Sequence, residues 1–189
     1  MQETAPQYIS RILGYIEGQD ALKVQRTTAA RLKKLIQNLT PAQLKRRPEP
    51  DKWSIAEIVA HLADTEVVAS WRLRSVIGNS GITIQPYDQE AWAAAFQYAK
   101  RNPQLSIETF RVLRENNLEM LREIPREAWD HYGMHLERGK ETVAHLARMF
   151  AGHDVNHVLQ VERIANEFKK SASGPRAKKK SKTKKKKRK

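Results

Sequence analysis

Residues 141–168 constrain the fold more than any other stretch, because they form one long amphipathic pattern with histidines on its apolar face. On a 3.6-residue helical wheel the apolar side chains fall on a single stripe. The stripe consists of Val143, Leu146, Phe150, Val161, Ile164 and Phe168. His153 and His157 lie on the same stripe, one turn apart, where a bundle helix normally carries Leu or Ile. The pattern predicts a helical bundle with an inward-facing pair of imidazoles.

Two interpretations of this pair stay open at the level of its spacing. Inward-facing imidazoles one turn apart are suited to a metal site in a helical bundle. They are also compatible with histidines that hydrogen-bond at the edge of a core. The spacing alone is weak support for a metal, since His131 and His135 repeat it in a connection that contains glycine.

His61 is the candidate for a third ligand. It is the only histidine in the first half of the chain, and it lies on a long helix pattern that faces the core. Three neutral imidazoles would leave a fourth metal position for water, as in reactive rather than structural sites. Imidazole suits Zn, Ni, Fe and Cu, so the type of ligand does not select the ion.

The composition excludes several classes of site. The 189 residues include no cysteine, which excludes disulfides, thiolate ligands and a cysteine nucleophile. The N-terminus lacks the apolar segment of a signal peptide, and no run approaches the ~18 apolar residues of a membrane span. We therefore expect a cytoplasmic protein that does not enter a membrane.

The net charge of +14 is concentrated at the C-terminus. Residues 169–189 hold 13 Lys or Arg and no acid, which leaves 22 basic and 21 acidic residues in the first 168. We expect one folded domain over residues 1–168 and a disordered Lys-rich tail over residues 169–189. Such a tail would be attracted to nucleic acid or another polyanion with little sequence preference.

The remaining patterns predict an all-α fold, a four-helix bundle with a long crossover between its second and third helices. No strand pattern is evident. Ser54 and Glu57 have the form of a capping box, and Asp20 and Asp88 are placed to cap helices. The expected helices cover residues 8–18, 20–38, 41–44, 54–77, 89–100, 103–124 and 141–168, and Leu105 is expected among the buried residues of the sixth.

Acidic side chains near the histidines are candidates for a base or for support of the ligands. They are Asp64, Glu66, Asp88 and Asp154. For each of them a helix cap, an ion pair or a solvated position is the simpler expectation. Glu66 lies near the centre of an apolar stripe, where we expect it to pair with an arginine of another helix. His131, His135 and His145 are interpreted as solvated or structural.

Two segments resemble the signatures of a known family. WSIAEIVAHLADTE (residues 53–66) and AGHDVNHVLQVERI (residues 151–164) are similar, in order and spacing, to those of the DinB-like superfamily. PYDQEAW (residues 86–92) resembles the crossover of its uncharacterised members, and the whole resemblance covers about residues 5–168. It implies a four-helix bundle with a metal site formed by His61, His153 and His157, a divalent ion such as zinc or nickel, and a homodimer.

The resemblance leaves the reaction open. The superfamily includes transferases that use bacillithiol or mycothiol, so the hypothesis is a metal-dependent hydrolase or thiol (S-)transferase that acts on a small molecule. Without a cysteine, thiol transfer would require an external low-molecular-weight thiol. The alternative is a non-catalytic, nucleic-acid-associated scaffold protein that binds polyanions through its tail.

Overall fold

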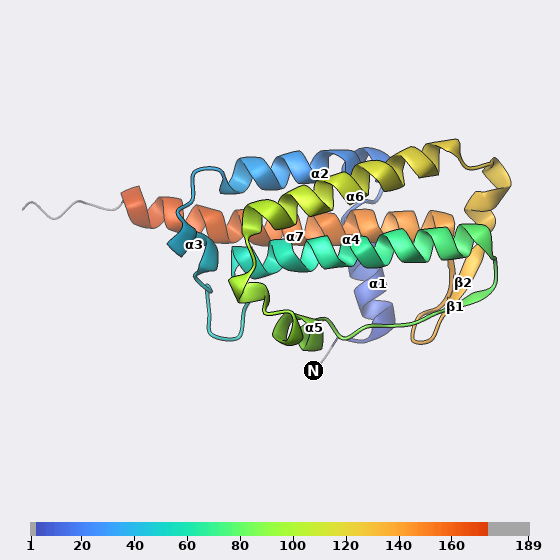
Figure 1. The fold of residues 1–189 in the computed structure, drawn as a ribbon, viewed down its shortest axis with the longest axis horizontal. Helices are drawn as coiled ribbons and strands as arrows, with labels where there is room; N and C mark the ends of the chain where they lie inside the picture. The colour runs from blue at the N-terminus through green and yellow to red at the C-terminus, as the bar shows by residue number, and fades with distance from the viewer. Residues whose placement is uncertain (1–2, 174–189) are drawn as a thin grey trace, which may run out of the picture.

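Four long helices form the body of the molecule in the computed structural model, which describes residues 3–173 (Figure 1). They are α2 (Ala21–Ile36), α4 (Ile55–Gly78), α6 (Pro103–Glu123) and α7 (Val143–Ser173). Helix α4 packs chiefly against α6, and α2 against α7. In Figure 1, α4 and α6 run in one direction while α2 and α7 run in the other, which requires a crossover between α4 and α6. The predicted four-helix bundle with this crossover is confirmed.

The helices begin where local sequence signals place them. The Asp20 carboxylate accepts from the backbone N–H groups of Leu22 and Lys23 at the start of α2. Ser54 and Glu57 form the predicted reciprocal capping box of α4. The shorter helical elements are α1 (Ala5–Gly14), α3 (Pro41–Lys45), α5 (Gln89–Ala95), η1 (Tyr98–Lys100) and η2 (Arg126–Asp130).

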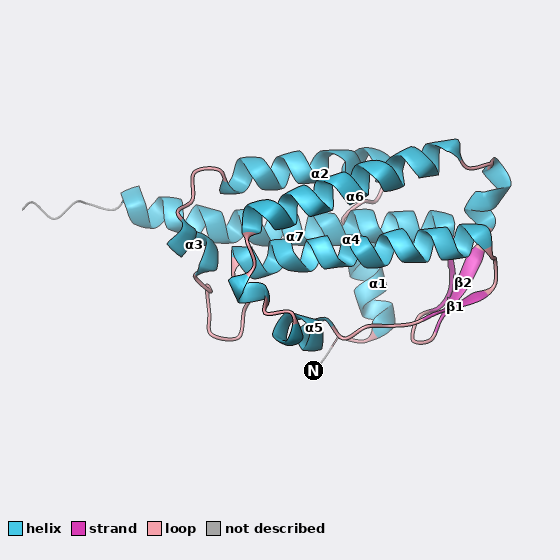
Figure 2. Cartoon of the chain, viewed as in Figure 1, coloured by secondary structure: helices cyan, strands magenta, loops and turns pink. Residues whose placement is uncertain are grey.

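A small sheet, which the sequence did not predict, closes one end of the bundle (Figure 2). Strand β1 (Ile82–Ile84) pairs in parallel with β2 (Tyr132–His135), and β2 pairs in antiparallel with β3 (Gly139–Thr142). The expectation of no strand was therefore wrong. Strands of three and four residues are too short for a clear two-residue period, and the β1–β2 pairing joins segments far apart in the sequence.

The apolar core consists of two clusters along the bundle. One contains Ile58 and Leu62 of α4 with Val158 and Val161 of α7. The other contains Ala69 and Leu73 of α4 with Leu146 and Phe150 of α7. On α7, residues 151–157 lie between the two clusters, so His153 and His157 fall in the gap between them. On α4 the gap begins after Ala63, and His61 lies at its edge, beside Leu62 of the first cluster.

Helix α1 packs very closely on α7 at Gly152. A Cβ atom built at Gly152 would lie 2.1 Å from the carbonyl oxygen of Ile12, so only glycine permits this approach. Gly152 directly precedes His153, and the contact brings the first helix to the histidine-bearing part of α7. The N-terminal helix thereby becomes one wall of the cavity described below.

Several details differ from the prediction. Helix α1 covers residues 5–14 and not 8–18, and the helix expected over residues 89–100 is divided into α5 and η1. Leu105 is 65% exposed, and Ile107 takes the buried position, because α6 turns Leu105 outward in its first turn. Helix α7 continues to Ser173, past the predicted end of the domain at residue 168. Residues 174–189 of the predicted tail lie outside the described residues. Within residues 3–173, no helix is long and apolar enough to cross a membrane.

A three-histidine cluster beside a cavity

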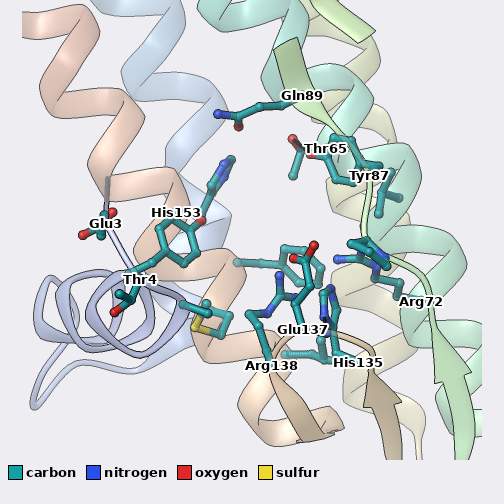
Figure 3. A pocket seen from close by; sticks show the side chains of 17 residues that line it. Glu3, Thr4, Thr65, Arg72, Tyr87, Gln89, His135, Glu137, Arg138 and His153 are labelled. Carbon is teal, nitrogen blue, oxygen red and sulfur yellow. Dashed lines mark hydrogen bonds between the residues drawn. The ribbon is translucent and has the colours of Figure 1, made fainter. Parts of the chain in front are cut away.

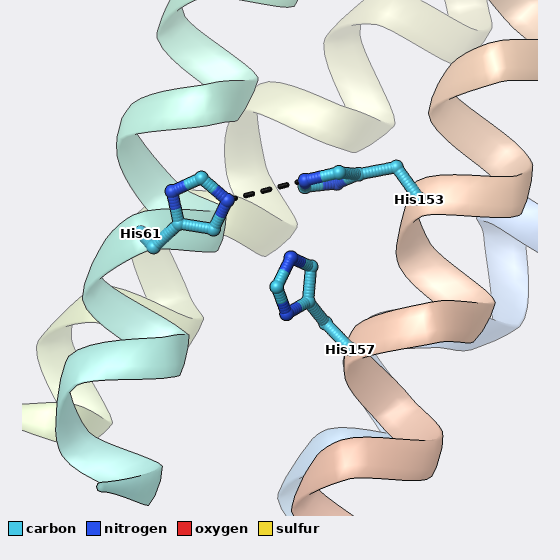
Figure 4. Close-up of side chains that lie close together, drawn as sticks. All are labelled: His61, His153 and His157. Carbon is cyan, nitrogen blue, oxygen red and sulfur yellow. Dashed lines mark hydrogen bonds between the residues drawn. The ribbon is translucent and has the colours of Figure 1, made fainter. Parts of the chain in front are cut away.

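The three predicted histidines meet in the gap between the core clusters (Figure 4). One ring nitrogen from each of His61, His153 and His157 lies within 4.8 Å of the other two. The Nε2 atoms of His61 and His153 are 3.1 Å apart. His61 comes from α4, while His153 and His157 come from successive turns of α7. The cluster therefore depends on the packing of two helices and not on the spacing within one.

Burial keeps these imidazoles neutral. His61 and His157 are 1% and 8% exposed, and His153 is half-buried. Burial lowers the pKa of His157 to about 4, and it holds the pKa of His61 and His153 well below the usual range, helped by repulsion from neighbouring histidines. Neutral imidazole is the form that binds a metal.

The donor set fits a divalent ion. With metal–nitrogen distances of about 2.0–2.1 Å, two nitrogens on a tetrahedral zinc lie roughly 3.3–3.4 Å apart. The His61–His153 separation of 3.1 Å is close to this edge. The Nδ1–H of His157 donates to the Gln160 side-chain oxygen at 2.9 Å, so the neutral ring carries its proton on Nδ1. Its Nε2 lone pair is then free, and Figure 4 shows a nitrogen of His157 directed toward the other two rings.

A cavity of about 340 Å³ opens beside the cluster (Figure 3). His153 and Thr65 line it, whereas His61 and His157 do not. Helix α1, the crossover segment and the β2–β3 turn contribute the other walls. A ligand in the cavity would therefore approach the cluster from the side of His153.

Two hydroxyl groups connect the cavity with the cluster. The Thr65 hydroxyl lies 3.4 Å from His61 Nε2 and 2.9 Å from the Tyr87 hydroxyl. Burial raises the pKa of Tyr87, so this hydroxyl keeps its proton. Thr65, Tyr87 and Gln160 were not identified from the sequence. The four-residue spacing from His61 to Thr65, and the three-residue spacing from His157 to Gln160, were the only signals available.

The acidic candidates have structural roles. Arg114 of α6 donates to Glu66 at 2.6 Å and also pairs with Asp154, which joins α4, α6 and α7. The predicted arginine partner of Glu66 is confirmed. Asp64 pairs with Arg101 at 2.6 Å, and the Asp88 carboxylate caps α5. Among the described residues, the histidine cluster contains no acid.

The other histidines lie outside the cluster. His131 Nδ1 contacts the Ile77 carbonyl oxygen at 2.8 Å, and His145 lies 4.0 Å from Glu141. His135 is only 2% exposed, because β2 turns its side chain inward toward the cavity. Its burial was not predicted, since residues 127–140 were expected to form a loop-rich stretch.

The sequence matches a family model and is similar to several known proteins. Residues 25–161 match the family model described as the DinB superfamily. A protein of Oceanobacillus iheyensis is 24% identical over 130 residues, which are 69% of this chain and 75% of that protein. YfiT of Bacillus subtilis is 21% identical over 146 residues, which are 76% of this chain and 82% of YfiT. The names of both assign them a predicted metal-dependent hydrolase activity.

The fold has a counterpart among solved structures. The structure of YfiT from Bacillus subtilis, described as a four-helix bundle of unusual topology, superimposes with a TM-score of 0.74. The match covers 89% of this chain and 91% of YfiT at 18% identity. This similarity shows that the bundle and its crossover are a known arrangement.

Proposed function

The chain belongs to the DinB superfamily, and we propose that it is a metal-dependent hydrolase of small molecules with His61, His153 and His157 as its metal ligands. The observation that carries the proposal is the meeting of three neutral imidazoles, two buried and one half-buried, beside an accessible cavity. A histidine cluster that only stabilised the fold would not need to lie beside a cavity. Three protein nitrogens and one free position are the pattern of a reactive metal site.

Zinc or nickel is the ion that we propose. Both suit imidazole ligands, and the donor set includes neither the thiolate favoured by copper(I) nor a carboxylate. When bound, such an ion would act as a Lewis acid, and it would lower the pKa of a water molecule bound to it to the neutral range.

The protein's own groups then have separate tasks. His153 lines the cavity, so a metal held by the three imidazoles would be reached by substrate from that side. The Tyr87 hydroxyl, held by Thr65, remains protonated and is placed to donate a hydrogen bond or a proton to a group in the cavity. Apolar clusters flank the histidines along α7, and the cavity is on the side that His153 lines.

Thiol transfer is the second reaction that this site could support. The chain has no cysteine, so the nucleophilic sulfur would come from an external low-molecular-weight thiol. A metal lowers the pKa of a coordinated thiol as it does that of water. The cavity lies in the size range of small-molecule sites, which leaves room for such a cofactor.

An activity screen separates these possibilities. Full-length protein, stripped of metal and reloaded with zinc or nickel, is assayed on esters, amides and electrophiles, each with and without a small thiol. A hydrolase gives metal-dependent turnover without thiol, whereas a thiol transferase requires it. The His61→Ala variant should lose turnover, and His145→Ala, whose ring lies outside the cluster, should keep it. Turnover that survives metal removal or His61→Ala would refute the proposal.

A further inference from the structure

The end of the cavity away from His153 carries a group of charged and polar side chains. Figure 3 shows Arg72, His135, Glu137 and Arg138 together on one side of the cavity, with His153 on the other. The proposed hydrolytic chemistry uses none of these four. Their hydrogen-bond partners indicate what this end of the cavity can bind.

Arg72 is a buried cation without an acidic partner. It is 7% exposed, and Nη2 donates to the Gln85 carbonyl oxygen at 2.6 Å. No ion pair involves Arg72 within residues 3–173. A guanidinium has five N–H donors, so most of its capacity remains unused. Burying a cation in this state is costly unless an anion joins it.

The nearby charged groups do not satisfy Arg72. Arg138 is engaged with Glu141 through two hydrogen bonds, at 2.7 and 3.1 Å. Glu137, the one acid that lines the cavity at this end, is exposed and forms no ion pair there. Burial, and after it repulsion by Arg138, lowers the pKa of Arg72. The two arginines and the two acids Glu137 and Glu141 balance in number, but Arg72 is the one buried charge among them that forms no ion pair within the described residues.

His135 adds an unsatisfied donor. Its Nδ1 accepts the backbone N–H of Glu137 at 3.2 Å, so the proton of the neutral ring is on Nε2. Nε2 is buried and has no hydrogen-bond partner among the described residues. A buried N–H without an acceptor costs free energy, and a small shift of the ring toward the cavity would let a ligand oxygen accept from it and remove this cost.

We propose that Arg72 and His135 form a binding subsite for an oxyanion, a carboxylate or phosphate group of the substrate. A planar guanidinium recognises either group through two parallel hydrogen bonds, and the Nε2–H of His135 supplies a third. The inference rests on the proposed function, since it assigns the anion to the molecule that reacts at the histidine cluster. The substrate is then a small acid that spans the cavity, with its reacting bond at His153 and its charged end at Arg72.

Direct titration of metal-free, full-length protein tests the subsite. The probes are acetate, inorganic phosphate and acetamide, the last being a neutral match for acetate, at constant ionic strength. Backbone NMR signals are followed after removal of the metal and of the chelator. We expect saturable shifts of β2 signals with acetate or phosphate and none with acetamide. The tighter of the two anions identifies the acid group of the substrate.

Variants locate the binding. Arg72→Gln should weaken anion binding at least roughly tenfold, because a charge-assisted pair is lost. Arg122→Gln removes the same charge from an exposed position at the end of α6 and should leave the affinity unchanged. Glu137→Gln should bind as tightly as wild type or more tightly. If Arg72→Gln fails to fold, His135→Gln must weaken binding instead.

The outcomes distinguish this inference from the proposed function. Equal anion affinity in Arg72→Gln and Arg122→Gln, or shifts that never saturate, would overturn the subsite. A protein that binds metal at the histidines but shows no Arg72-dependent anion binding leaves the proposed function intact. A protein that binds anions through Arg72 but binds no metal has the subsite without the proposed chemistry.

Discussion

At the scale of single residues, the three histidines differ in what holds their rings. Gln160 fixes the ring of His157 through Nδ1, whereas the Nδ1 atoms of His61 and His153 are buried without partners among the described residues. A hydrogen bond to the non-ligating nitrogen of a metal-binding histidine sets its tautomer and orients the ring. Gln160 is therefore the side chain that we expect to prepare His157 for a metal.

Removal of this amide tests its role. Gln160→Leu should lower metal affinity roughly 10-fold to 100-fold, as do losses of comparable partners in other metal sites. Asn156→Leu is the matched control, because Asn156 lies on the same helix and its oxygen accepts from Arg11 and not from an imidazole. Competition with a chelating dye measures both affinities. Equal affinities for the two variants would contradict the assignment.

The pKa of His135 predicts a pH effect on stability. Burial lowers it to about 4 in the folded protein, whereas an exposed histidine titrates near ~6.5. Between these values the unfolded chain binds more protons, so the free energy of unfolding falls as the pH falls. Urea unfolding of metal-free protein at about pH 7 and about pH 5 measures this. Between these two pH values the His135→Gln variant should lose less stability than the wild type. An equal loss in both proteins would contradict the lowered pKa of His135 in the folded state.

At the scale of elements, a buried charge network joins three of the four long helices. Arg114 of α6 contacts Glu66 of α4 and Asp154 of α7, and Asn117 donates to Glu66 at 2.7 Å. Asp154 directly follows His153, and Glu66 lies five residues after His61, so the network fixes the relative position of α4 and α7 near the cluster.

Breaking this network should be costly. Arg114→Met leaves two buried carboxylates without a cation, and we expect a loss of about 3–5 kcal/mol in the free energy of unfolding. Arg111→Met removes an exposed arginine of the same helix and should change stability little. Urea denaturation compares them. A small loss in Arg114→Met would mean that the network does not hold the helices together.

The helices and strands also differ in how far the sequence alone could predict them. Helix starts at Asp20, Ser54 and Asp88 depend on neighbours within three residues, so they were predicted correctly. The burial of His135 depends on β2 pairing with β1, which lies about fifty residues earlier, and no local signal indicates it. The wheel placed Glu66 inside, but only the packed bundle shows that Arg114 is its partner.

At the scale of the whole molecule, the net positive charge of the sequence is concentrated at its C-terminus. Residues 174–189 hold 11 Lys or Arg and no acid, and their composition predicts binding to polyanions. The core clusters found within residues 3–173 extend no further along the chain than Phe168. We expect an unchanged melting temperature and a sharp loss of retention on heparin or DNA at low salt. A much lower melting temperature would show that the segment contributes to the fold.

Metal analysis of purified, full-length variants tests the central claim most directly. The account predicts about one divalent ion per chain in wild type, if the three imidazoles form one site. His61→Ala and His157→Ala should each lose most of the metal, with folding verified by circular dichroism. His131→Ala, from the second pair with four-residue spacing, should retain it, because its ring lies outside the cluster. Full metal content in His61→Ala, or its loss in His131→Ala, would contradict a site formed by the convergence of α4 and α7.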